Sequence, residues 1–129
     1  MTASPHVPVS WGELIDRVTI LEIKAERLSD NIARTRVARE LAGLSDLVGS
    51  AALDPRVLSL KRALREVNET LWSIEDEIRQ KEARQQFDAD FIRLARAIYQ
   101  NNDERGRLKR EINLVLQSDF GEEKQYTNY

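Results

Sequence analysis

The chain has 129 residues and a formal net charge of -2, with 41% hydrophobic and 33% charged residues, which favours one domain of long amphipathic helices and excludes a disordered chain. It contains no cysteine and a single histidine, which excludes a disulfide framework and a cysteine-based zinc site, so we expect neither a metal nor another cofactor. The acidic balance also argues against a nucleic-acid partner.

The first expected element is an extended segment over residues 1–9. It has no basic region followed by an apolar core, and no run approaches the roughly 18 apolar residues of a membrane span. We therefore expect a cytoplasmic protein that has no membrane partner. A helix over residues 11–48 follows, because Ser10 and Glu13 form the S-x-x-E pattern of a capping box.

The apolar residues of this first helix recur at spacings of three and four, as in a coiled-coil seam. The seam comprises Trp11, Leu14, Val18, Leu21, Ala25, Leu28 and Ile32. It is interrupted and then resumes in a shifted register from Val37 onward. Such a shift predicts a changed helix path near residues 34–39.

A second helix is predicted over residues 55–85, because Asp54 is a good cap and Pro55 suits the first helical position. A third is predicted over residues 89–117, and residues 118–129 form a tail without periodicity. Helices of about 30 residues would each be about 45 Å long. The sequence therefore predicts a single all-α domain, an elongated antiparallel bundle of three long helices with coiled-coil-like seams.

The third helix carries polar residues on its apolar face. At about 100° per residue, the polar patch of Asn101, Asn102, Arg105 and Lys109 falls on the face of the apolar residues at both ends of the helix. Unpaired buried charge costs several kcal/mol, so this patch needs complementary groups. Glu22 on the first helix and Glu75 on the second are the partners that we expect for Arg105.

Two interpretations of this patch stay open. In one, Arg105 pairs with Glu22 or Glu75 in a buried ionic network that fixes helix register. In the other, Arg105 and Lys109 clamp a small anionic ligand in a cleft. The candidate residues for the network or the cleft are Glu22, Asn68, Trp72, Glu75, Arg79, Tyr99, Asn102, Arg105 and Lys109.

The other residue clusters indicate neither a catalytic site nor a metal site. Glu13 and Asp16 lie in the first turns of a helix and are interpreted as solvated charges, and no complete pair of metal-binding acidic motifs is present. No catalytic residue is identified. Ile20 and Ile23 lie roughly opposite the main seam of the first helix, which predicts a dimer face.

The segment V-P-V-S-W-G-E-L-I-D-R-V-T-I-L-E-I-K at residues 7–24 resembles the opening signature of a bacterial family of short proteins classed as a domain of unknown function. The resemblance continues through residues 67–79 and 87–105 and the closing E-E-K-Q-Y-T-N-Y, so it covers most of the chain. The family usually has lysine where this chain has Arg17. The resemblance implies no activity, cofactor or catalytic residue.

These patterns favour a non-enzymatic helical interaction or assembly protein, a self-associating dimer that also has a protein partner. The alternative is a helical protein that binds a small anionic ligand, or a metal-independent enzyme with a polar cleft at mid-bundle. That alternative is an analogy of architecture to the helical chorismate mutases, in which preorganised cations bind a dianionic substrate.

Overall fold

The computed structural model describes residues 3–125 and 127–129, and within these ranges it is all-helical. This confirms the predicted all-α class. No helix in these ranges is long and apolar enough to cross a membrane. The elements in chain order are α1 Trp11–Arg27, α2 Asn31–Val48, a short 3₁₀ helix η1 Gly49–Leu53, α3 Pro55–Ala83 and α4 Ala89–Val115.

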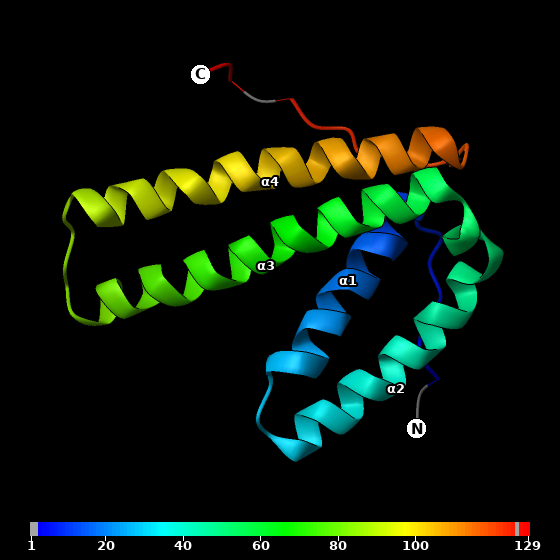
Figure 1. Cartoon of the computed structure of the whole chain (residues 1–129), viewed down its shortest axis with the longest axis horizontal. Helices are drawn as coiled ribbons and strands as arrows, with labels where there is room; N and C mark the ends of the chain where they lie inside the picture. Colours follow the sequence, from blue (N-terminus) through cyan, green and yellow to red (C-terminus); the bar gives the residue numbers. More distant parts are fainter. Residues whose placement is uncertain (1–2, 126) are drawn as a thin grey trace.

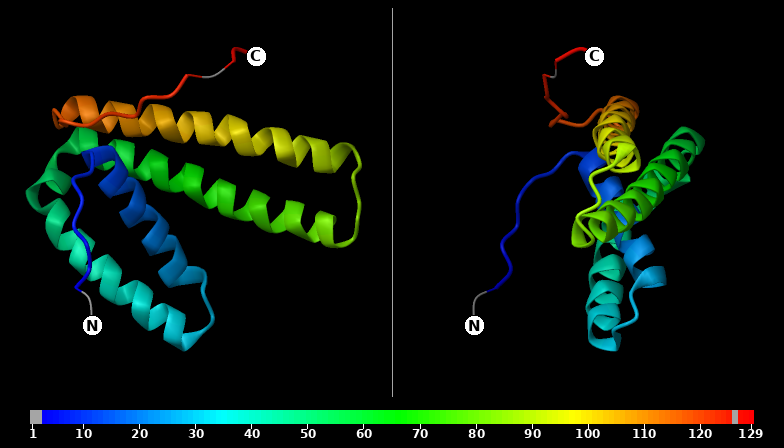
Figure 2. Two further views of the ribbon diagram at one scale, coloured as in Figure 1. Left: turned by 180° about the vertical axis from the view of Figure 1, so that it is seen from behind. Right: turned by 90° about the vertical axis from the view of Figure 1, so that its left-hand side faces the viewer.

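The four helices form two hairpins (Figure 1). α3 and α4 make a long antiparallel hairpin, and the shorter α1 and α2 make a second one, whose α1 packs against both α3 and α4. The far part of the long hairpin extends beyond α1 and α2 (Figure 2). The structure thus differs from the predicted elongated bundle of three long helices.

The difference arises because the helix predicted over residues 11–48 is interrupted. Leu28 has extended backbone angles, and the side chain of Asp30 accepts a hydrogen bond from the backbone N–H of Ala33. Asp30 therefore caps a new helix, α2, as aspartate does at many helix starts. The change of path lies at residues 28–30, before the shifted seam that indicated it at residues 34–39.

The bounds of the other helices lie close to those expected from the sequence. α3 begins at Pro55 and ends at Ala83, against a predicted 55–85, and α4 begins at Ala89 and ends at Val115, against 89–117. Asp54 caps α3 and Asp88 caps α4.

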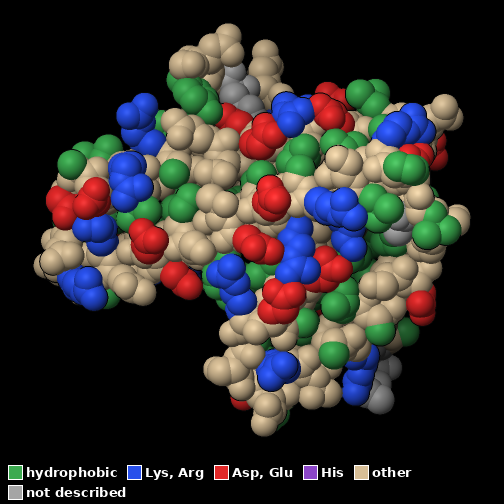
Figure 3. All heavy atoms as spheres, in the orientation of Figure 1, with side chains coloured by type: hydrophobic (Ala, Val, Ile, Leu, Met, Phe, Trp, Pro, Cys, Tyr) green, Lys and Arg blue, Asp and Glu red, His purple; other side chains and the backbone are tan. Residues whose placement is uncertain are grey.

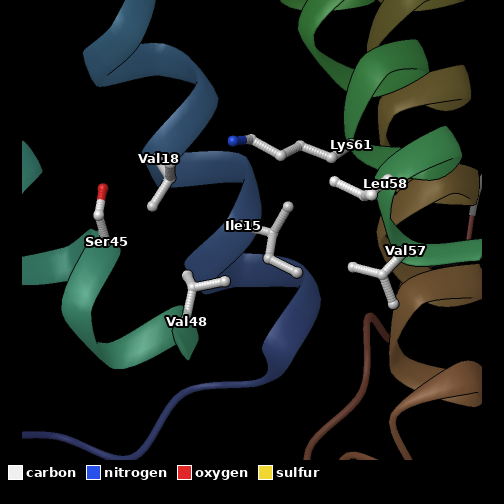
Figure 4. A pocket seen from close by; sticks show the side chains of 7 residues that line it. All are labelled: Ile15, Val18, Ser45, Val48, Val57, Leu58 and Lys61. Atoms are coloured by element: carbon white, nitrogen blue, oxygen red, sulfur yellow. The ribbon is translucent and has the colours of Figure 1, made fainter. Parts of the chain in front are cut away.

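The hydrophobic core lies where the two hairpins meet. Its buried residues are Ile15, Val18, Val48, Val57, Leu64, Leu108 and Ile112. A small cavity of about 80 Å³ remains between α1, α2 and α3 (Figure 4). Its lining is mostly apolar, and Lys61 extends across one side of it.

The molecule divides into two regions, which we name the arm and the base. The arm is residues 74–98, the end of the α3–α4 hairpin that projects from the remainder (Figure 1). The base comprises α1, α2 and the other residues of α3 and α4. Of the arm residues, all of which the structure describes, only Leu94 is buried. The apolar residues that α3 and α4 turn toward each other in the arm stay half-buried, namely Ile74, Ile78, Phe91 and Ile98.

Candidate functional site

The polar patch of α4 meets the carboxylate of Asp16 on α1. The Arg105 Nε and Nη2 atoms donate to the two oxygens of Asp16 at 2.9 and 2.5 Å. The Asp16 side chain is 1% exposed and that of Arg105 is 30% exposed. These hydrogen bonds raise the pKa of the Arg105 guanidinium. The pair is thus a bidentate, charge-assisted contact with its anionic half inside the protein.

Helix α3 completes this contact through Asn68. Its Nδ2 atom donates to Asp16 Oδ1 and to Thr19 Oγ1, both at 2.9 Å, and the Thr19 hydroxyl donates to the Asp16 backbone carbonyl at 2.7 Å. Asn68 and Thr19 are both buried. Side chains from α1, α3 and α4 therefore meet in one hydrogen-bonded group, which we name the Asp16 network: Asp16, Thr19, Asn68 and Arg105.

Lys109 lies on the same face of α4 and is also paired. Its Nζ atom contacts Glu13 of α1 at 2.7 Å and Glu122 of the C-terminal tail at 2.9 Å. Burial of Lys109 disfavours its charge, but the hydrogen bonds to Glu13 and Glu122 outweigh burial and raise its pKa. Lys109 thus joins the start of α1 to the tail.

The start of α1 lies directly against α4. The Gly12 N–H donates to Asn113 Oδ1 at 2.7 Å, and the Trp11 N–H donates to Ser118 Oγ at 2.9 Å. A Cβ atom at Gly12 would lie 2.4 Å from the Lys109 carbonyl oxygen, so only glycine permits this approach. Backbone donors that a helix start leaves unpaired are satisfied here by one side chain of α4 and one from the residues after it.

The partners expected for Arg105 are engaged elsewhere. Glu22 contacts Lys61 at 3.1 Å and Arg65 at 3.5 Å, because at about 100° per residue it lies about 120° around α1 from Asp16. Glu75 lies 3.4 Å from Arg79 of its own helix, in an exposed pair. The predicted pairing of Arg105 with Glu22 or Glu75 is therefore wrong, as is the interpretation of Asp16 as a solvated charge.

The pairs of Glu22 belong to a chain of surface charges that also includes Glu26 and Glu69, both bound to Arg65. Figure 3 shows positive and negative side chains interspersed over α1 and the middle of α3. Such a mixed surface provides no extended positive field for nucleic acid.

An open cleft of about 280 Å³ lies beside the Asp16 network, between α1, α3 and α4. Its apolar lining comes from Ile20, Ile23, Leu71 and Trp72, and its polar lining from Asn68, Glu75, Asn102 and Arg105. We name it the Trp72 cleft. Ile23 is 1% exposed, so it packs within the chain, and with Ile20 it lines this cleft. The two isoleucines opposite the main seam of α1 are thus explained by contacts within one chain, and they do not require a dimer.

A second cavity, of about 390 Å³, lies between α4 and the C-terminal tail. Its lining includes Tyr99, Asn102, Arg105 and Lys109 from α4 and Glu122 from the tail. The tail returns along α4 (Figure 1). Near its end the Tyr129 hydroxyl donates to Asp103 at 2.5 Å, and its ring meets that of Tyr99 edge to face.

The predicted site residues are thus distributed over two hollows that share Asn102 and Arg105. Asn68, Trp72 and Glu75 line the Trp72 cleft, whereas Tyr99 and Lys109 line the cavity beneath the tail. Glu22 and Arg79 line neither of the two. Asn101 donates to the carbonyl of Ala97 within its own helix at 2.8 Å.

Sequence reasoning missed the residues of α1, of the end of α4 and of the tail that complete the patch: Gly12, Asp16, Thr19, Asn113 and Ser118. The available signal was their position. Asp16 and Thr19 lie on the side of the first helix that carries Ile20 and Ile23, and a charge or a hydroxyl that is buried there requires a partner. Gly12 is the second residue after the helix cap Ser10, within a helix, where glycine is otherwise unfavourable.

No cluster of three or more metal-binding side chains occurs in the part of the chain that the structure describes. A family model described as a family of unknown function, DUF6165, matches residues 5–129. No curated protein and no solved structure matches the chain.

Proposed function

The chain belongs to the family of unknown function DUF6165. From its geometry, we propose that it is a non-enzymatic helical assembly protein that self-associates through its arm. The observation that carries this proposal is the apolar seam of the arm, which two helices alone leave half-exposed.

The pairing of the polar patch supports a structural use of its charges. Arg105 is neutralised by Asp16, and Lys109 by Glu13 and Glu122. A cation that stabilises the charge of a transition state would need a field that its own partners do not neutralise. The Asp16 network instead holds three helices in one register, as buried polar residues do in coiled coils.

The arm presents the apolar surface through which copies would associate. Ile74 and Ile78 on α3 and Ile98 on α4 are half-buried, and Phe87 and Ile92 are 58% and 57% exposed. Two antiparallel helices cannot enclose such a seam, whereas four can. Two arms related by a two-fold axis would make a four-helix bundle, with the same surface of each copy buried.

The charges of the arm are complementary in such a pair. Residues 75–77 form an acidic trio on α3, and Arg93 and Arg96 are exposed on α4. When α3 of one copy lies along α4 of the other, the exposed Asp76 and Glu77 of each copy lie near the basic pair of its partner. Such complementarity favours a second copy over an unrelated partner.

Light scattering coupled to size-exclusion chromatography tests this proposal on the full chain at micromolar concentration. We expect a mass of twice 14.9 kDa for the wild type. Ile92→Glu places a charge on the arm and is expected to give a monomer. The matched control is Ile32→Glu, at a 65% exposed isoleucine of α2 outside the arm, which is expected to stay dimeric. A monomeric wild type, or a dimer that Ile92→Glu leaves intact, would overturn the proposal.

A further inference from the structure

The side chain of Asn68 lines the Trp72 cleft, and its hydrogen bonds fix the orientation of its amide group. Asn68 is 6% exposed and donates from Nδ2 to Asp16 and Thr19. The carboxylate accepts only, and the single Thr19 hydroxyl hydrogen is donated to the Asp16 carbonyl. Both partners therefore require the NH₂ side of the amide, and the Oδ1 atom is left to the cleft. Among the described residues, the side-chain hydrogen bonds of Asn68 are the two that Nδ2 donates.

Arg105 is oriented in the same way. Its Nε and Nη2 atoms are held by Asp16, so Nη1 takes no part in that pair while the side chain lines the cleft. A guanidinium that is held in place and still has N–H groups to donate is well suited to bind a carboxylate oxygen. A buried partner that holds the side chain in place reduces the entropy lost when a ligand binds.

The net charge of the cleft argues against a simple anion. The charge of Arg105 is already balanced by Asp16, and Glu75 adds a carboxylate whose pair with Arg79 is long and exposed. A ligand that carried only negative charge would find Arg105 already paired and the carboxylate of Glu75 in the same lining. A ligand with an ammonium group would pair with Glu75 and donate to Asn68 Oδ1.

The remaining lining is apolar. Ile20, Ile23, Leu71 and Trp72 form the wall, and the guanidinium of Arg27 lies over the Trp72 ring, 5.9 Å from its centroid. The volume of about 280 Å³ lies just below the range of roughly 300–1,000 Å³ that is usual for drug-sized ligands. The cleft thus suits a small molecule with an apolar body.

From these observations we infer that the Trp72 cleft binds a free zwitterion of the apolar amino-acid class. Its carboxylate contacts Arg105 Nη1, its ammonium group contacts Asn68 Oδ1 and Glu75, and its side chain lies against Trp72. This binding activity goes beyond self-association and does not depend on it, because Asn68, Glu75, Arg105 and Trp72 all belong to the same chain.

The test uses the full chain and three related probes. L-phenylalanine carries both charges, 3-phenylpropanoate lacks the ammonium group and 2-phenylethylamine lacks the carboxylate. The readout is the indole N–H signal of Trp72 in a proton–nitrogen correlation spectrum, with the indole of Trp11 as an internal control outside the cleft. We expect saturable shifts of the Trp72 signal with L-phenylalanine, and at least tenfold weaker binding of either analogue.

A matched pair of variants locates the ammonium contact. Glu75→Gln removes the carboxylate of the cleft and is expected to weaken L-phenylalanine binding about tenfold. Glu77→Gln removes the same charge from the same acidic trio but does not line the cleft, and is expected to bind like the wild type. The absence of a saturable shift at Trp72, equal binding of all three probes, or equal effects of the two variants would overturn the inference.

Discussion

The base and the arm share the helices α3 and α4, yet those helices bury different amounts of their surface in the two regions. In the base, α1 packs against both of them, so that Leu64, Leu108 and Ile112 are almost fully buried. In the arm, α3 and α4 pack mainly against each other, and apart from Leu94 their large apolar residues stay at least partly exposed. The third helix makes the difference, because two packed helices cover only one stripe of each other.

The same difference decides where a polar residue is tolerated on an apolar face. The Asp16 network lies where three helices supply donors and acceptors, and its carboxylate is 1% exposed. In the arm, two ion pairs lie on exposed side chains, Glu75 with Arg79 and Asp90 with Arg93. Exposed pairs of this kind contribute little to stability, so the two regions are expected to respond differently to the loss of a charge.

The largest expected effect comes from Arg105→Ala. This change leaves the buried Asp16 carboxylate without its cation, and breaking such a pair lowers the free energy of unfolding by about 3–5 kcal/mol. Urea denaturation measures it. The control Arg107→Ala removes an exposed arginine of the same helix that is paired with Glu104 and Glu111, and is expected to cost much less. Equal costs would show that the Asp16 network does not hold the base together.

Removal of one large apolar side chain from each region tests the difference in burial. Leu64 of the base is 0% exposed, and Leu64→Ala is expected to lower the free energy of unfolding by about 2–5 kcal/mol. Ile78 of the arm is half-buried, and Ile78→Ala is expected to cost about 1 kcal/mol in the monomer, since less surface is lost from the packed state. Urea denaturation of dilute protein measures both, and a cost at Ile78 as large as that at Leu64 would contradict the comparison.

A smaller effect is expected at the contact that brings α1 to α4. A methyl group at Gly12 would lie 2.4 Å from the Lys109 carbonyl oxygen, so Gly12→Ala must move the helices apart and is expected to cost about 1–3 kcal/mol. Gly43→Ala is the matched control, because no atom lies within 4 Å of a Cβ there. In the interior of α2, alanine is expected to stabilise by about 0.5–1 kcal/mol. Thermal melting distinguishes the opposite signs.

The sequence predicts the helices better than it predicts their contacts. Periodicity and caps locate α3 and α4, because each signal depends only on residues that are close together in the sequence. The shifted seam predicts a change of path at residues 34–39, whereas the helix ends at residues 28–30, since Leu28 continues the apolar seam and conceals the cap at Asp30. The inward direction of Arg105 follows from helical geometry, but its partner does not. Whether Asp16, Glu22 or Glu75 meets it depends on the crossing of α1 over α4, which no local pattern contains.

The smallest expected effect is a loosening of the arm's tip in acid. The backbone N–H of Phe91 and the ammonium of Lys81 hold the pKa of Asp88 below its usual value of 3.8. A carboxyl group with a lowered pKa in the folded state stabilises that state above its unfolded pKa, and this contribution is lost as pH falls from about 3.8 through the folded pKa. We therefore expect the Phe91 amide signal to shift and broaden in that window, while Asp88→Asn, which keeps a cap but cannot titrate, shows no such change. An Asp88→Asn variant with the same pH response would assign the loosening to another group.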